Sequence, residues 1–195
     1  MKASCVVDWN NHLREVCAAQ ILANPRVIGG PNMTVEIDES MFTNRKNYVG
    51  RQLPQQWILR SICRETKECF MVIISDRSAT TLLPIIEDNI RPCVAIISDG
   101  WSPYENIINI GHFQHLNVNH SLHYINPTNG VHTPNIERHW KSAKEKKRQK
   151  WHSRRSTGFI IYVRVYMATR DWIKRVGLDP FDSILQHIVD FWLPQ

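Results

Sequence analysis

The stretch Thr34-Val-Glu-Ile-Asp-Glu-Ser-Met-Phe42 decides how the rest of the chain is interpreted. Apolar and acidic residues alternate along it, and this period of two predicts a β-strand. Val35 and Ile37 fall on one face of such a strand, and Glu36 and Asp38 fall on the other. Ligands of α/β enzymes bind outside the carboxyl ends of the strands, so an acid there is a candidate metal ligand. Asp38 therefore needs acidic partners further along the chain.

The totals of the sequence restrict the class of protein. A chain of 195 residues suits one domain with a small appendage. No apolar run is long enough to span a membrane, and the first residues lack a signal-peptide pattern, so we expect a soluble, intracellular protein. The five cysteines are odd in number and scattered, which favours reduced thiols. The net charge of +6 favours a polyanionic partner.

The pattern after the first strand predicts a mixed α/β sheet. Residues 57–63 and 69–74 are two strands joined by a short hairpin, and the unbroken apolar run 93–97 is typical of a strand buried in a parallel sheet. A weaker strand covers 113–120. Helices are predicted for 78–90, with Ser78 as N-cap and Pro84 near its start, for 102–108, and from 132 onward. Three antiparallel strands followed by parallel strands, with helices on both faces, are the expected architecture.

Two flanking segments are expected to be helical. Residues 1–30 have helical apolar spacing followed by a Pro- and Gly-containing linker, and they are either a strut or the remnant of a longer N-terminal module. Residues 31–155 form the main domain, and 156–195 form a C-terminal helical extension packed on it. The stretch 181–192 is amphipathic, which is consistent with packing on the domain or with a homodimer interface.

Three acids are candidates for one metal site. Asp38 and Asp99 each end a predicted central strand, and Glu137 lies one turn into the late helix. Carboxylates are the ligands that Mg²⁺ prefers, and two such ions about 3.5–4 Å apart can catalyse an in-line phosphodiester displacement. The alternatives stay open at this point: Asp99-Gly100 is also a turn sequence, Glu137 is favourable near any helix N-terminus, and Asp38 can bond a neighbouring turn.

A basic segment and several histidines add further candidates. Residues 141–155 contain eight lysines or arginines and one glutamate, which indicates either a solvated helix face or a phosphate-contacting helix. The spacing of His112, His115, His120 and His123 invites a zinc site. No thiol pair joins these histidines, and alternate strand positions point apart, so we do not assign zinc.

Six motifs occur in the order VEIDES, CRETKECF, DRSATTLLPII, IISDGW, VNHS and HTPNIERHW. In this order the sequence resembles the transposase domain of the Merlin superfamily and its bacterial insertion-sequence relatives, the ISXO-like transposases. The resemblance implies a ribonuclease H-like fold and a DDE-type triad that binds Mg²⁺ or Mn²⁺, with two ions. Carried over by position, the triad is Asp38, Asp99 and Glu137, with Asn135 as the fallback for the third ligand.

The resemblance also implies double-stranded DNA, as transposon ends and target, for a partner. The candidate DNA contacts are Arg45, Lys46, Arg51, His120, Lys141, Lys144, Lys147 and Arg148. Residues 1–30 are then the remnant of an N-terminal DNA-binding region. The expected function is metal-dependent DNA cleavage and strand transfer, in the nucleus of a eukaryote or the cytoplasm of a bacterium. Two alternatives stay open: a catalytically silent, host-adopted DNA-binding derivative and a plain metal-dependent nuclease.

Overall fold

The structure, a computed structural model, describes residues 3–41, 56–118, 132–150 and 158–192. The chain forms two compact units: residues 26–152 make one, and residues 1–25 together with 153–195 make the other. The first of these units contains the sheet, and the second is helical. No helix in the described ranges is long and apolar enough to cross a membrane.

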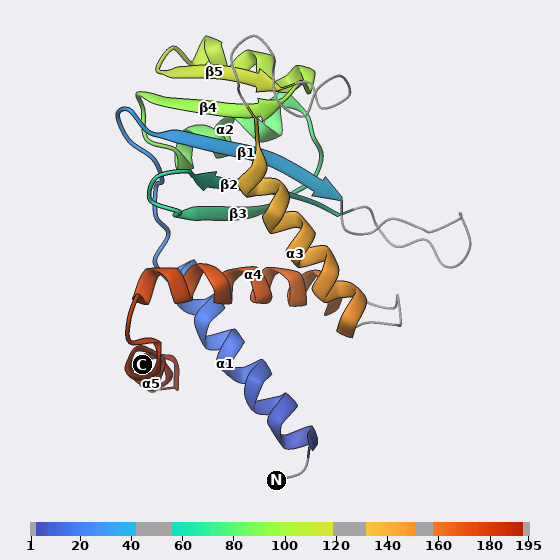
Figure 1. Cartoon of the computed structure of the whole chain (residues 1–195), viewed down its shortest axis with the longest axis vertical. Helices are drawn as coiled ribbons and strands as arrows, with labels where there is room; N and C mark the ends of the chain where they lie inside the picture. The colour runs from blue at the N-terminus through green and yellow to red at the C-terminus, as the bar shows by residue number, and fades with distance from the viewer. Residues whose placement is uncertain (1–2, 42–55, 119–131, 151–157, 193–195) are drawn as a thin grey trace, which may run out of the picture. The chain divides into compact units, whose positions relative to one another are not determined.

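The larger unit is built on a five-stranded mixed sheet with the order β3-β2-β1-β4-β5 (Figure 1). Antiparallel pairing joins β1 to β2 and β2 to β3, whereas β4 pairs in parallel with both β1 and β5. The strands are β1 (Thr34–Met41), β2 (Trp57–Cys63), β3 (Cys69–Ile74), β4 (Val94–Asp99) and β5 (Phe113–Val118). This is the predicted succession of three antiparallel strands followed by parallel ones, and the predicted 64–68 hairpin is confirmed.

One face of the sheet carries the main hydrophobic core. Val35 and Ile37 of β1 lie on this face with Ile96 of β4, and all three are completely buried. The helix α2 (Ala79–Asn89) covers them with Leu82 and Ile86. A second covering element, η1 (Ser102–Ile110), adds Tyr104 and Ile107. Alternation along β1 therefore places its apolar residues in this core, as the sequence predicts.

The helix predicted from residue 102 is confirmed, and it is a 3₁₀ helix over residues 102–110. The predicted N-cap of α2 is wrong. Ser78 precedes α2 but its side chain does not cap the helix, because its hydroxyl bonds Asp76 at 2.5 Å. Pro84 lies inside α2, which begins at Ala79 and is not delayed by the proline. The ring is tolerated at an exposed position, where the carbonyl that loses its helical partner can bond water.

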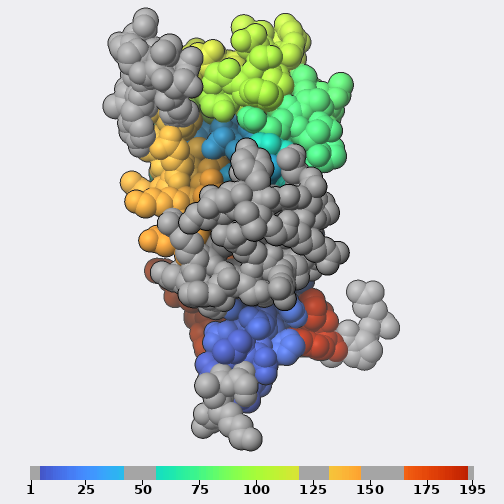
Figure 2. All heavy atoms as spheres, turned by 90° about the vertical axis from the view of Figure 1, so that its right-hand side faces the viewer, coloured from blue at the N-terminus to red at the C-terminus, as the bar shows by residue number. Residues whose placement is uncertain are grey.

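The opposite face of the sheet is covered by α3 (Pro134–Lys150), which contacts β1 and β2. Ile136, His139, Trp140 and Ala143 are its buried residues, and their spacing forms one stripe of a helix. In the space-filling view, the atoms of α3 (orange) lie at the surface beside those of β1 (Figure 2). The described residues on the other flank of α3 are polar, and most are exposed. One side of this helix therefore covers the sheet, and the other side faces solvent.

The helical unit consists of α1 (Ala3–Ala23), α4 (Gly158–Val176) and α5 (Pro180–Trp192), and α1 packs against both of the others. The indole of Trp172 in α4 donates to His187 Nδ1 in α5 at 3.0 Å. The guanidinium of Arg175 donates to the Asn24 carbonyl at 2.7 Å. The two ends of the chain thus fold together. The three-part division at residues 30 and 155, and the packing of the C-terminal segment on the main domain, stay predictions.

Gly29 provides a test of how tightly the core is packed. Its φ is +80°, and an added Cβ would lie 2.8 Å from Val94 Cγ2 and 3.1 Å from Val35 Cγ2. We expect Gly29→Ala to lower the free energy of unfolding by roughly 2–4 kcal/mol, since backbone strain and overpacking add. Gly111→Ala is the control, because its φ is +84° but its Cβ would meet nothing within 4 Å. Urea unfolding that gave equal losses for both would contradict this packing.

Candidate active site

The register of two parallel strands brings Asp38 and Asp99 together. The parallel pairing of β1 with β4 ends at Glu36 and Ile97. Asp38 and Asp99 each follow two residues later, and the charge of Asp99 acts on the Asp38 carboxyl. Both side chains fall on the sheet face that α3 covers, since they are two residues from Glu36 and Ile97. Neighbouring strands lie about 4.8 Å apart. Asp99 ends β4 as predicted, whereas Asp38 lies inside β1, because β1 continues to pair with β2 as far as Met41.

The electrostatic environment makes ionisation of Asp38 costly. Burial, together with the negative charges of Glu39 and Asp99, raises the pKa of its carboxyl to about 7. The Glu39 backbone N–H and the Trp140 indole act in the opposite direction without offsetting this effect. Two carboxyls side by side in a partly buried position therefore repel each other. Such a pair favours either a proton or a bound cation.

Glu137 lies in the first turn of α3, the helix that contacts β1 and β2 on this face of the sheet. It is half-buried and precedes Trp140, whose indole contacts Asp38, by three residues. These two positions are neighbours on a helix surface, so Glu137 lies on the flank of α3 that approaches Asp38. Among the residues that the structure describes, no group of three His, Cys, Asp or Glu is arranged to hold a metal ion. The structure thus brings two predicted ligands together and leaves the third on the adjacent helix.

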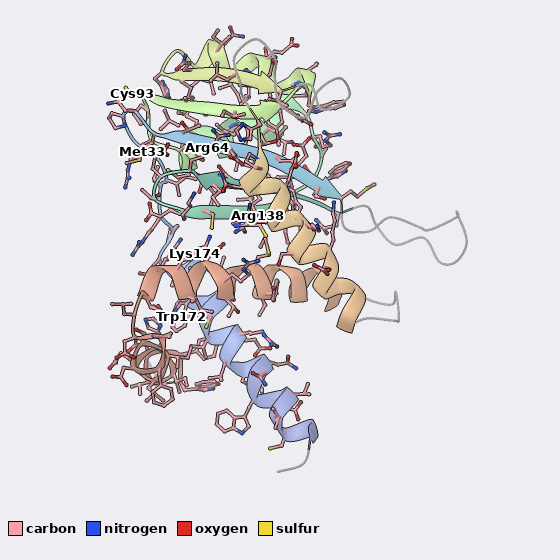
Figure 3. The ribbon with its side chains drawn as sticks, in the orientation of Figure 1. Met33, Arg64, Cys93, Arg138, Trp172 and Lys174 are labelled. Carbon is pink, nitrogen blue, oxygen red and sulfur yellow. The ribbon has the colours of Figure 1, made fainter. Side chains whose placement is uncertain are left out.

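Asn135, the fallback ligand, is bound to Glu36. Its backbone N–H donates to Glu36 Oε2 at 3.0 Å, and its side-chain amide donates to Oε1 at 2.8 Å. Glu36 is completely buried and also accepts from Arg64 Nε at 2.7 Å. Figure 3 shows Arg64 beside β1, near the start of α3. Strand alternation places Glu36 on the same face as Asp38. This alternation is the signal in the sequence from which a structural role of Glu36 beside Asp38 can be predicted.

A second network, also missed from the sequence, fixes the turn that follows Asp99. The Trp101 backbone N–H donates to Asp99 Oδ1 at 3.1 Å, and its indole N–H donates to the Arg77 carbonyl at 3.2 Å. The Arg77 guanidinium stacks on the Trp101 ring at 4.1 Å and forms an ion pair with Glu39. Tyr104 donates to Glu39, and burial together with the charge of Glu39 raises the pKa of its phenol. Glu39 therefore holds the elements on either side of Asp99.

The predicted DNA contacts are only partly within the described residues. Lys141 and Lys144 are exposed on α3. Lys147 and Arg148 belong to the same helix, but the structure does not describe their side chains. The other candidates lie wholly outside the described residues: Arg45, Lys46, Arg51 and His120. Of the four histidines considered for zinc, His123 is also outside it.

The two described histidines of that set do not face each other. The ring of His115 bonds the Ser98 hydroxyl at 2.8 Å, and burial lowers the pKa of the imidazole. His112 is exposed and lies 4.0 Å from Glu87. Both therefore have contacts that require no metal. The contact of His115 adjoins the pair, because the Ser98 hydroxyl also donates to the Asp99 carbonyl at 2.8 Å.

Comparison with known families adds to this geometry. The model of the ISXO2-like transposase domain matches residues 30–171, which is most of the chain and contains every predicted site residue. The chain belongs to the ISXO2-like transposase family. This membership confirms the resemblance to ISXO-like transposases, and the sheet order is the ribonuclease H-like arrangement that the resemblance implied. The link to the Merlin superfamily stays a prediction.

Individual relatives are distant. An uncharacterized transposase-like protein of Haemophilus influenzae is 28% identical over 75 residues, which span 38% of this chain and 58% of that protein. Among solved structures, the catalytic core domain of BIV integrase covers 82% of this chain and 98% of its own, with 13% identity and a TM-score of 0.42. The HTLV-2 integrase catalytic core in complex with magnesium covers 73% and 84%, with 10% identity and a TM-score of 0.38.

The raised pKa of Asp38 predicts how stability depends on pH in this transposase-family chain. The carboxyl has a pKa of about 7 in the folded protein and its ordinary pKa of 3.8 in the unfolded chain. The folded state therefore holds the proton more tightly, and this contribution is complete below pH 4 and is lost as the pH rises through 7. Since one pKa unit corresponds to about 1.4 kcal/mol, the shift from 3.8 to about 7 contributes roughly 4 kcal/mol.

We therefore expect Asp38→Asn to stabilise the metal-free protein at pH 8 and to flatten its stability between pH 4 and 8. Urea unfolding in the presence of EDTA, repeated across this pH range, measures the effect. Asp88→Asn, at an exposed position of α2, is the control and should follow the wild type. A pH profile of Asp38→Asn that matched the wild type would disprove the electrostatic repulsion.

Proposed function

We propose that this chain is a DDE-type transposase catalytic domain that cleaves DNA and transfers the cut strand to a target. Asp38, Asp99 and Glu137 are the catalytic carboxylates in this proposal. The observation that supports it most strongly is the effect of the Asp99 charge on Asp38, two acids that follow the paired ends of parallel strands β1 and β4. Family membership supports the same reaction class. The matched segment spans 58% of the H. influenzae relative, so this activity is a proposal for the chain itself.

The residues present fit a divalent cation such as Mg²⁺ or Mn²⁺. Two neighbouring carboxyls whose charges repel each other are a favourable donor set for a hard cation. Mg²⁺ is usually held by one or two protein carboxylates together with substrate phosphates, so two protein ligands suffice for a first ion. Two ions would stabilise the attacking and leaving oxygens of an in-line displacement at phosphorus. In this proposal the protein holds and orients them through Asp38 and Asp99.

Glu137 is the better candidate for the third ligand. The backbone N–H and the side-chain amide of Asn135 both donate to Glu36, so this side chain already has a structural role. Glu137 contributes a negative charge that an amide lacks, and it lies on the flank of α3 next to Trp140 and Asp38. With the first turn held in place, a change of the Glu137 side-chain rotamer on binding metal and DNA would complete the site.

The same flank of α3 offers a track for DNA. Lys141 and Lys144 follow Glu137 at spacings of four and seven residues, so all three positions share one side of the helix. Both lysines are exposed, and the net charge of the chain is +6. We propose that they bind the phosphate backbone of double-stranded DNA leading to the carboxylates. The proposed DNA-binding set also includes Lys147, Arg148, Arg45, Lys46, Arg51 and His120. The proposed working form is a homodimer in the nucleus or the bacterial cytoplasm.

Plasmid nicking tests the catalytic assignment. The purified chain should nick supercoiled DNA in the presence of Mg²⁺ or Mn²⁺ and should lose this activity with EDTA. Asp38→Asn and Asp99→Asn should each lower the nicking rate at least 100-fold, because each removes a charged ligand of the proposed ions. Asp88→Asn is the matched control, being an aspartate on the exposed side of α2, and it should retain the wild-type rate.

The outcomes of this assay separate the alternatives. Metal-independent nicking, or nicking that persists in both aspartate variants, would refute the proposal. DNA binding without any nicking would identify a catalytically silent derivative. A chain that nicks DNA but never joins a 3′-hydroxyl end of a labelled oligonucleotide to the plasmid would be a plain nuclease.

Salt dependence tests the proposed DNA track on α3. We expect Lys141→Gln and Lys144→Gln each to reduce the slope of log affinity against log salt concentration by about 1, because each removes one phosphate contact. Fluorescence anisotropy with a labelled duplex at several salt concentrations measures this slope. Lys174→Gln, which removes an exposed lysine of α4, is the control. An unchanged slope in both α3 variants would exclude these contacts.

A further inference from the structure

Glu36 is a buried carboxylate that the proposed chemistry does not use. Its side chain has no solvent exposure, although it lies between the sheet and the first turn of α3. A buried charge is costly unless hydrogen bonds satisfy it completely. Here Oε1 accepts from Arg64 Nε at 2.7 Å and from the Asn135 amide at 2.8 Å, and Oε2 accepts from the backbone N–H groups of Asn135 at 3.0 Å and Ile136 at 2.9 Å.

These four bonds hold the start of α3 in a fixed position. The first N–H groups of a helix have no partner within it, and a negative charge there also interacts favourably with the helix dipole. Glu36 supplies both the acceptor and the charge across a sequence separation of about 100 residues. Arg64 extends the attachment, because its guanidinium also donates to the carbonyl of His132, two residues before α3 begins. The helix therefore cannot shift along the sheet without breaking several buried bonds.

The position of this attachment connects two of the proposed catalytic acids. Glu36 lies two residues before Asp38 on the same strand and the same face. Ile136, whose N–H it binds, immediately precedes Glu137. We propose that Glu36 is a positioning residue that sets the distance between the Glu137-bearing turn and Asp38. This inference rests on the proposed function, since it assigns Glu36 a role through Glu137.

The Glu36→Gln variant distinguishes a positioning role of Glu36 from a role in packing alone. Glu36→Gln preserves the size of the side chain but replaces one acceptor oxygen with a donor NH₂ group. Each Glu36 oxygen accepts two N–H bonds, so either orientation of the amide would direct N–H groups at each other. The first turn of α3 should move away from β1 without a cavity in the core. Asp38 and Asp99 would keep their register, which backbone pairing of β1 with β4 maintains.

Mn²⁺ affinity of the full chain, measured by isothermal titration calorimetry, tests the proposal with a double-mutant cycle. Glu137→Gln should lower the affinity if Glu137 is a ligand. Glu36→Gln should lower it by about tenfold or more, which is typical for loss of a residue that orients a metal ligand. The double variant Glu36→Gln/Glu137→Gln should bind no more weakly than Glu137→Gln alone, because Glu36 acts through Glu137.

Two further variants keep the result interpretable. Arg64→Gln removes one of the four bonds to Glu36 and should lower Mn²⁺ affinity less than Glu36→Gln does. This variant replaces Glu36→Gln in the test if Glu36→Gln does not fold. Ile86→Val lowers stability from the opposite face of the sheet and should leave Mn²⁺ affinity unchanged.

Unchanged affinity in Glu36→Gln and Arg64→Gln, with a loss in Glu137→Gln, would overturn the positioning role alone. A wild type that binds no Mn²⁺, or an unaffected Glu137→Gln, would overturn the proposed metal site and this inference together.

Discussion

Parallel pairing between β1 and β4 is the constraint on which the site depends. It brings Asp38 and Asp99 onto neighbouring strands, where burial and the charges of Glu39 and Asp99 make ionisation of Asp38 costly. The sheet tolerates this because its other face is well packed: Val35 and Ile37 lie completely buried beneath α2 and η1. A stable core on one face thus maintains a strained charge arrangement on the other. Such a separation of roles suits a site whose electrostatics change when a cation is present.

β1 serves both faces through simple alternation. Its even-numbered acids, Glu36 and Asp38, lie toward α3, whereas Glu39 lies on the core face with Arg77 and Tyr104. Each of the two structural glutamates is satisfied by a cationic side chain and by further donors, as buried charges require. Asp38 is different, because burial and the neighbouring charges of Glu39 and Asp99 raise its pKa. The strand therefore contains two glutamates held by cationic partners and one aspartate whose ionisation is costly.

The helix α3 links the buried site to the exposed basic surface. Its buried stripe of Ile136, His139, Trp140 and Ala143 packs on β1 and β2, and its polar flank presents Lys141 and Lys144. His139 bonds the buried Arg60 at 3.2 Å, so even the polar members of this stripe contribute to the packing. The helix is anchored at its first turn, where Glu36 binds it, and it extends from there with exposed charges. This arrangement is that of a chain belonging to the ISXO2-like transposase family.

Local pattern alone determined much of this protein: the strands from their periodicity, the 64–68 hairpin from its length, and the neighbouring positions of Asp38 and Asp99 from the buried parallel strand. Those features depend on residues close in sequence or on general rules of sheet geometry. Only the tertiary structure decided that residues 102–110 form a 3₁₀ helix, that Glu36 anchors α3, and that α1 folds with α4 and α5. The last two depend on contacts between segments about 100 or more residues apart, for which a hydrophobic pattern contains no information about the partner.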